Sequence, residues 1–174
     1  MFKRINEKTD MKLKVKLLSF IVTATVLYAG TGHPHGDNKD HDEEAEYDAV
    51  SKPFGEYEPG LEPVKTINVS MADTMRFTPS EITVKAGDVV RFVVANDGEI
   101  QHEFVLGTAE SLSEHAELML KFPSMEHEEP YMAHVSPGKT KEIIWKFPEA
   151  GNYEFGCLLP GHFAAGMKGT IAVL

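Results

Sequence analysis

Three side chains that carry sulfur or imidazole nitrogen lie close together near the C-terminal end of the sequence. They are Cys157, His162 and Met167, which follow the pattern Cys-x4-His-x4-Met between two stretches that are predicted to be strands. The connection contains a Pro-Gly pair and a further glycine, residues that allow sharp turns. The fold must therefore provide a tight connection between two strands in which a thiol, an imidazole and a thioether all turn inward.

The N-terminal region predicts a secretory signal peptide over residues 1–29. Three lysines precede an apolar run, Leu17–Ala29, which ends at Gly-Thr-Gly. The run is shorter than the ~20 apolar residues of a membrane-spanning helix, so we expect export and cleavage and no stable membrane anchor afterwards. Acidic residues among the first ten suit such a signal poorly, so the start at Met1 or Met11 and the cleavage position stay open.

Residues 30–63 are acidic, poor in aliphatic side chains and interrupted by prolines, a composition typical of a disordered arm. The arm carries His33, His35 and His41, for which a solvated tail is the simpler interpretation. Without residues 1–29, which hold six basic and two acidic residues, the formal net charge is −14. We expect no nucleic-acid binding, because that depends on basic surfaces that face phosphates.

Cys157 is the only cysteine of the chain, so no internal disulfide can form. A free cysteine is often an inert residue of the core. In an exported protein, however, an unpaired thiol is open to oxidation and needs a specific reason. Its position beside a histidine and a methionine favours metal binding.

A fourth candidate ligand, His102, lies far upstream at the start of another predicted strand. Two imidazoles and a thiolate with a weak axial thioether are the ligands of a type 1 copper site. Structural zinc sites rarely use a thioether, and iron–sulfur clusters need more cysteines than this chain has. The sequence therefore predicts one copper ion held by His102, Cys157, His162 and Met167.

From residue 64 onward, apolar and polar side chains alternate in several short runs, which is the pattern of β-strands. The run Val89–Ala95 is almost entirely apolar and predicts a centrally placed strand. Gly-Asp, Pro-Gly and Ala-Gly pairs supply turns between the runs. Several short strands with regular turns predict an all-β sandwich over residues 64–174.

This region resembles the cupredoxins, small blue copper proteins of the plastocyanin–azurin type. The resemblance rests on three segments, MRFTPSEITVKAGDVVRFVVAN, GEIQHEFVLG and GNYEFGCLLPGHFAAGMKGTIAV. It implies a Greek-key β-sandwich that binds copper at the four predicted positions. The HEF segment and a Met/His-rich insert are most similar to periplasmic cupredoxins associated with copper tolerance in bacteria, which implies a periplasmic location.

The insert interrupts the strand pattern between residues 111 and 135. Ser111–Lys121 predicts a short helix, because Ser111 and Glu114 have the spacing of a capping box, and an irregular loop follows to about Val135. Thioether and imidazole together suit copper, Cu(I) especially, so a second copper ion could bind here. Alternatively, the methionines only fill space over the sandwich. The candidate residues are His115, Met119, Met125, His127, Met132 and His134.

Two functions fit these features. One is copper handling and tolerance with a redox-active copper, and the other is mobile electron transfer between respiratory partners. An enzyme is not expected, because copper enzymes of this type need additional centres built on His-x-His pairs, and the sole such pair lies in the arm. A redox partner would dock near His162, where apolar residues could form an exposed patch or instead pack on the sandwich. They are Leu158, Leu159, Pro160, Phe163, Ala164 and Ala165.

Overall fold

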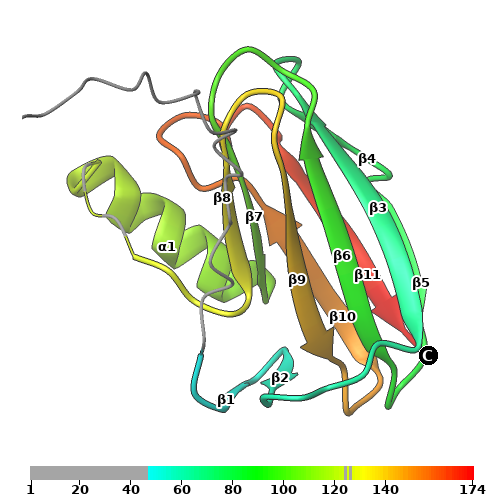
Figure 1. The fold of residues 1–174 in the computed structure, drawn as a ribbon. Coiled ribbons are helices and arrows are strands. Elements are labelled where there is room, and N and C mark those ends of the chain that lie inside the picture. The colour runs from blue at the N-terminus through cyan, green and yellow to red at the C-terminus, as the bar shows by residue number, and fades with distance from the viewer. Residues whose placement is uncertain (1–46, 124, 126) are drawn as a thin grey trace, which may run out of the picture. The chain divides into compact units, whose positions relative to one another are not determined.

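The computed structural model describes residues 47–123, 125 and 127–174, which contain eleven strands and one helix (Figure 1). The predicted signal peptide, the choice between Met1 and Met11 and the first part of the arm lie outside the described residues. Within the described part of the chain, no helix is long and apolar enough to cross a membrane.

The first sheet has six strands in the order β1, β2, β9, β6, β3, β4. Strands β3 and β6 run parallel and the other neighbours run antiparallel. The strands are β1 (Val50–Lys52), β2 (Gly55–Tyr57), β3 (Lys65–Ala72), β4 (Arg76–Thr78), β6 (Val89–Asn96) and β9 (Thr140–Lys146).

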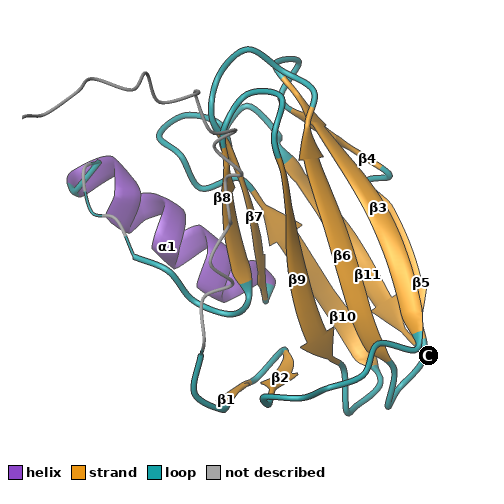
Figure 2. Cartoon of the chain, in the orientation of Figure 1, coloured by secondary structure: helices purple, strands orange, loops and turns teal. Residues whose placement is uncertain are grey.

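The second sheet has five strands in the order β5, β11, β10, β7, β8. Strands β5 and β11 run parallel, and the remaining pairs are antiparallel. The strands are β5 (Glu81–Val84), β7 (His102–Gly107), β8 (Met132–Val135), β10 (Gly151–Gly156) and β11 (Lys168–Val173). The two sheets pack face to face around a shared core, and Figure 2 shows the helix next to β7 and β8 of the second sheet.

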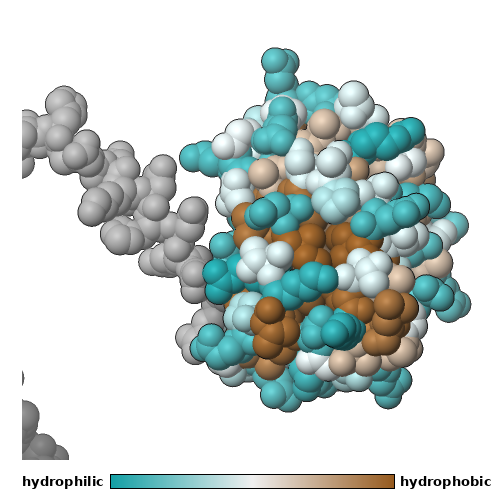
Figure 3. Space-filling view, turned by 90° about the vertical axis from the view of Figure 1, so that its right-hand side faces the viewer, coloured by the Kyte–Doolittle hydropathy of each residue, from teal (hydrophilic) through white to brown (hydrophobic). Residues whose placement is uncertain are grey.

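The two sheets enclose one large apolar core, as the alternation of side chains along β6 illustrates. Val90, Phe92 and Val94 are fully buried, whereas the residues between them are only half-buried. The ring of Phe92 packs on Phe104 of the opposite sheet, with 5.4 Å between the ring centroids. The predicted all-β sandwich is confirmed, and β6 lies inside its sheet as expected. On the face viewed in Figure 3, apolar areas lie between polar side chains.

Helix α1 (Ala109–Lys121) is present as predicted but begins earlier, because Thr108 and not Ser111 is its N-cap. The Thr108 hydroxyl accepts the N–H of Ser111 at 3.1 Å, and the Ser111 hydroxyl accepts the N–H of Thr108 at 2.9 Å. Ser111 therefore plays the part that Glu or Gln usually takes in a capping box, which the sequence pattern did not reveal.

The helix buries one face against the second sheet, so every residue of β7 is buried. A small apolar cluster fills the space between helix and sheet. Its buried members are Val105, Leu112, Met119, Met132 and Leu158. This second layer explains why both faces of β7 are buried, whereas one face of β6 is only half-buried.

The prediction of a disordered arm up to residue 63 differs from the structure, because β1 and β2 lie within that range. Between them, Phe54 is 5% exposed and its ring stacks on Trp145 at 5.5 Å between centroids. The indole N–H of Trp145 also donates to the Phe54 carbonyl at 3.1 Å. One buried aromatic residue thus anchors a stretch whose acidic composition predicted disorder.

The prediction of an irregular loop up to Val135 is also wrong at its end. Residues Met132–Val135 form β8, which pairs antiparallel with β7. Its sequence, Met-Ala-His-Val, does not alternate between apolar and polar side chains, so only the pairing with β7 reveals this strand.

Candidate metal centre

His102 is the first residue of β7 and is completely buried. Its Nε2 lies 3.0 Å from Asp73 Oδ1. An ionised carboxylate only accepts hydrogen bonds, so Nε2 donates, and in the neutral form of the ring Nδ1 keeps its lone pair. Among the described residues, this buried Nδ1 has no hydrogen-bond partner. A buried nitrogen without a partner is unusual, and a metal ion would satisfy it.

The loop that precedes β7 fixes Asp73. The backbone N–H of Glu99 donates to Asp73 Oδ2 at 2.8 Å and, together with the bond from His102, lowers the pKa of this carboxyl. Gly98 permits the approach, because a Cβ atom there would collide with Asp73 Oδ1. The buried Asn96 side chain holds the same loop by donating to two backbone carbonyls, each at 2.8 Å.

Cys157 directly follows β10, and its side chain is buried. Its Sγ accepts the N–H of Glu103 at 3.3 Å and lies 3.2 Å from His162 Nδ1. Burial raises the pKa of the thiol to about 12, so the group is neutral at pH 7 in the absence of a cation. A bound cation would displace this proton, and the N–H of Glu103 would then stabilise the thiolate.

The connection that carries Cys157, His162 and Met167 is tight, as the sequence predicted. Gly161 and Gly166 have φ angles of +89° and +93°, which other residues rarely adopt. The N–H of Cys157 donates to the Met167 carbonyl at 3.0 Å, so the two ends of the connection lie side by side. Met167 is completely buried in the same core as Cys157.

His162 is half-buried at the surface end of this connection. Its ring lies next to that of His102, with 5.2 Å between the centroids. Burial, and secondly the neighbouring His102, lower the pKa of His162. Its imidazole is therefore neutral at pH 7, which is the form that binds metals.

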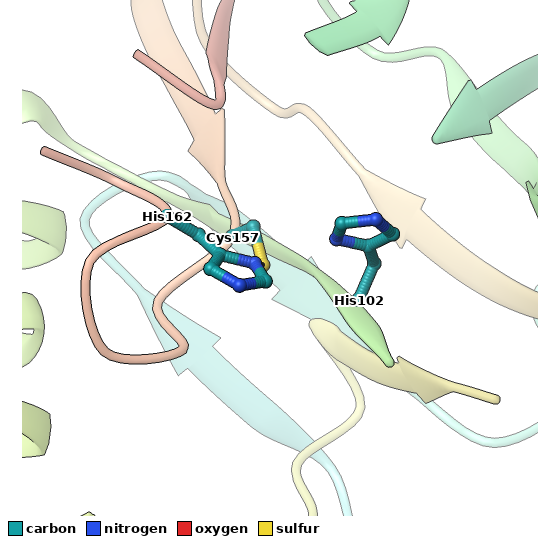
Figure 4. A group of neighbouring side chains, drawn as sticks. All are labelled: His102, Cys157 and His162. Atoms are coloured by element: carbon teal, nitrogen blue, oxygen red, sulfur yellow. The ribbon is translucent and has the colours of Figure 1, made fainter. Parts of the chain in front are cut away.

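The three side chains come from two segments, the start of β7 and the connection after β10, and face one another (Figure 4). One ligand atom from each of His102, Cys157 and His162 lies within 4.8 Å of the other two. Two imidazoles, a soft thiol sulfur and a buried thioether are the set of donor groups that copper prefers. The residues present thus fit a copper ion.

Comparison with known families agrees with this geometry. Residues 64–174 match the model of the copper-binding proteins of the plastocyanin/azurin family. The chain belongs to this family. The resemblance seen in the sequence is thereby confirmed.

Three curated relatives in the comparison are named copper-resistant cuproprotein CopI. The protein of Rubrivivax gelatinosus is 47% identical over 150 residues, which cover 86% of this chain and 89% of the relative. The protein of Vibrio cholerae serotype O1 is 40% identical over 114 residues, which cover 65% of this chain and 68% of the relative. Among solved structures, auracyanin A of Chloroflexus aurantiacus, titled a "blue" copper protein, superposes with a TM-score of 0.55 at 23% identity. That superposition covers 65% of this chain and 100% of auracyanin A, and it shows the fold.

The methionines and histidines of the insert have different surroundings in this cupredoxin. Met119 and Met132 are buried in the apolar cluster beneath α1, in agreement with the alternative that these methionines fill space over the sandwich. His115 and His127 instead face each other, with 4.9 Å between ring centroids, and His127 Nδ1 is buried without a partner among the described residues. Met125 is 38% exposed.

His134 uses both of its ring nitrogens in hydrogen bonds. Nε2 lies 3.0 Å from the His127 carbonyl oxygen, and Nδ1 lies 2.9 Å from Glu103 Oε1. Both partners accept, so both nitrogens donate and neither keeps a lone pair for a metal ion. The bond to Glu103 accordingly raises the pKa of His134. In this arrangement, His134 is not free to bind copper.

The apolar residues around His162 divide between core and surface. Leu158 is buried and is not part of an exposed patch, whereas Pro160, Ala164 and Ala165 are exposed. Beside them, α1 and the connection that carries Cys157, His162 and Met167 border a groove of about 160 Å³. It is lined by Ser113, Ala116, Glu117, Leu120, Leu158, Leu159, Gly161, Phe163 and Ala164.

Sequence reasoning missed three polar residues that support the metal centre, namely Asp73, Asn96 and Glu103. Each occupies an ordinary position, in a turn or at the end or start of a strand, so its residue type alone gave no signal. Because neighbouring residues of a strand point to opposite faces, the Glu103 side chain should point away from the ligands. Its side chain does so, but its backbone N–H reaches Cys157 Sγ.

Proposed function

We propose that this protein is a periplasmic type 1 copper protein of copper tolerance, with copper held by His102, Cys157, His162 and Met167. The observation that carries the proposal is the convergence of one ligand atom each from His102, Cys157 and His162 to within 4.8 Å of one another. In the described part of the chain, the buried Nδ1 of His102 also has no hydrogen-bond partner. The names of the relatives, copper-resistant cuproproteins, support the link to copper tolerance. The apolar N-terminal run supports export to the periplasm.

A copper ion in this site would supply one-electron redox chemistry between Cu(I) and Cu(II). The chain's part is to hold the ligands in a fixed arrangement. Asp73 orients the His102 ring, and the N–H of Glu103 donates to the sulfur. Burial of Cys157 and Met167 excludes water from the sulfur ligands. Since the supports lie in strands and short bonded loops, little rearrangement should accompany a change of oxidation state.

Mobile electron transfer between respiratory partners is the second candidate function. The half-buried His162 beside the apolar groove supports it, because a redox partner could dock on this surface. Tolerance is preferred because the insert adds metal-binding side chains that a simple electron carrier does not need. Neither function requires a substrate site, so we propose a binding and redox protein and not an enzyme.

A second copper site in the insert is part of this proposal. The facing rings of His115 and His127 support this second site. His134 does not contribute a ligand in the observed arrangement, because both of its ring nitrogens are hydrogen-bonded. If the second site exists, the protein should take up more than one equivalent of Cu(I). Joint replacement of His115, Met125 and His127 should abolish the extra uptake and leave the visible thiolate-to-copper absorption of the Cys157 site intact. Saturation at one equivalent in both proteins would make the insert a structural cover.

Deletion of the gene tests the two functions against each other. Copper tolerance predicts that the deletion strain becomes sensitive to added copper while respiration at low copper stays normal. Expression of the Cys157→Ser variant should not restore growth, whereas the wild-type gene should. A respiratory defect combined with normal copper resistance would instead support the electron carrier.

A further inference from the structure

Glu103 is only 2% exposed, although it carries a carboxylate. It is the second residue of β7, so its side chain points to the face opposite His102, beneath α1. Burial of a carboxylate costs free energy unless hydrogen bonds and an opposite charge compensate it. The partners of Glu103 therefore indicate why this position is acidic.

Two of its contacts lead to the segment that carries the thiol. The N–H of Glu103 donates to Cys157 Sγ at 3.3 Å, and the N–H of Leu158 donates to Glu103 Oε2 at 3.2 Å. The backbone ladder between β7 and β10 ends at the pair Val105 and Gly156. Beyond that pair, Glu103 holds the Cys157–Leu158 segment to β7 through its backbone N–H and its side-chain carboxylate.

The third contact leads to the insert. Glu103 and His134 are directly opposite each other in the ladder of β7 and β8, and Oε1 lies 2.9 Å from His134 Nδ1. The other nitrogen of His134 donates to the carbonyl of His127. A continuous series of hydrogen bonds therefore joins the insert to the peptide after Cys157, with Glu103 in the middle.

We propose that Glu103 is a positioning residue of the copper centre, which fixes the Cys157–Leu158 segment against β7 and connects it to the insert through His134. The proposal rests on the copper site proposed above and adds a residue that touches no metal. It predicts that the geometry at the sulfur depends on a carboxylate on the far side of the strand.

Three variants separate positioning from packing. Glu103→Ala removes both side-chain bonds. Glu103→Gln is isosteric, since its oxygen can accept from Leu158 while its amide donates to a neutral His134. Val105→Ala is the matched control, because Val105 lies two residues along on the same face and is 1% exposed but makes no polar side-chain contact. If Glu103→Ala does not fold, Glu103→Asp replaces it, since the shorter side chain cannot reach both partners.

The first readout needs no copper. In the metal-free protein, Glu103→Ala should increase amide hydrogen exchange at Leu158 about tenfold relative to neighbouring amides of β10, as expected for the loss of one charge-assisted hydrogen bond. Glu103→Gln should retain the protection of the wild type. Val105→Ala should lower overall stability without this local change.

The second readout is spectroscopic. In the Cu(II) protein, Glu103→Ala should shift the thiolate-to-copper band and the EPR hyperfine splitting, whereas Glu103→Gln and Val105→Ala should resemble the wild type. Unchanged exchange and spectra in Glu103→Ala would overturn the proposal, as would a Glu103→Gln variant that behaves like Glu103→Ala. A wild-type protein without any thiolate-to-copper band would instead refute the copper site, and the exchange experiment would still test the role of Glu103.

Discussion

The carboxylate of Asp73 contacts the imidazole of His102, with 3.0 Å between Oδ1 and Nε2, and thereby decides which ring nitrogen faces the metal centre. Partners of this kind orient a ligand histidine and increase its basicity, and their loss typically weakens metal binding 10–100-fold. A stronger ligand favours Cu(II), the more highly charged state. The contact should therefore lower the reduction potential of the copper.

Replacement of Asp73 by asparagine tests this contact. An amide has one acceptor oxygen, so it cannot serve both His102 and the N–H of Glu99, and it carries no charge. We expect binding of Cu(II) relative to Cu(I) to weaken about tenfold, which corresponds to a rise of about 59 mV in the reduction potential. Asp97→Asn is the control, because it removes the same charge from an exposed position in the neighbouring loop. Equal shifts in both variants would show that only the charge matters.

Cys157→Ser should abolish the visible absorption of the Cu(II) protein, because a hydroxyl cannot replace the soft thiolate. The far-UV circular dichroism should remain that of a β-sandwich, since the substitution removes little volume. Optical titration with Cu(II) measures the loss. Retention of an intense band by the serine variant would refute Cys157 as a ligand.

Met167→Leu should keep the copper and raise its reduction potential. The leucine fills a similar volume in the core, but it lacks the weak axial sulfur that helps to stabilise Cu(II). Cyclic voltammetry of the two proteins gives the shift, and the copper content of the purified variant confirms binding. An unchanged or lower potential would argue that Met167 does not contact the metal.

The metal-free protein should lose stability as the pH rises above 9. The folded-state pKa of Cys157 is raised to about 12 from a reference value of 9.0, so the folded state favours the neutral thiol. The resulting stabilisation is fully present below pH 9 and is lost between about pH 9 and pH 12, where the unfolded chain ionises first. Urea unfolding of the wild type and of Cys157→Ser across this range isolates the effect, because all other groups are shared. Parallel pH profiles would contradict the prediction.

Phe54→Ala should destabilise the domain by about 3 kcal/mol, because it empties a buried site against Trp145. Phe122→Ala is the matched control, since that ring is 56% exposed and its loss should change stability by less than about 0.5 kcal/mol. Thermal or urea unfolding of the metal-free proteins provides the comparison. Equal effects would mean that residues 47–63 contribute no more to the domain than a surface side chain does.

Local patterns in the sequence were enough to predict the sandwich, its interior strand and the set of candidate ligands. Alternating burial identifies strands such as β6, because every second side chain must enter the core. The ligands on the last connection are recognisable because Cys157, His162 and Met167 lie within eleven residues of one another. Only His102 is remote, and its place at the start of a strand made it a candidate.

Tertiary structure alone decided what surrounds these ligands. Asp73 reaches His102 across 29 positions of sequence, and Glu103 reaches Leu158 across 55. Neither pair has a local pattern, since the contacts arise only when β3, β7 and β10 are assembled. The same reason applies to Phe54, which finds Trp145 91 residues away, and to His134, whose nitrogens are engaged only because β8 lies beside β7. The sequence by itself therefore determined the fold and the candidate donor atoms. The packing of distant strands determined their orientation, their protonation and which histidines remain free, because those properties depend on neighbours that the chain brings together only on folding.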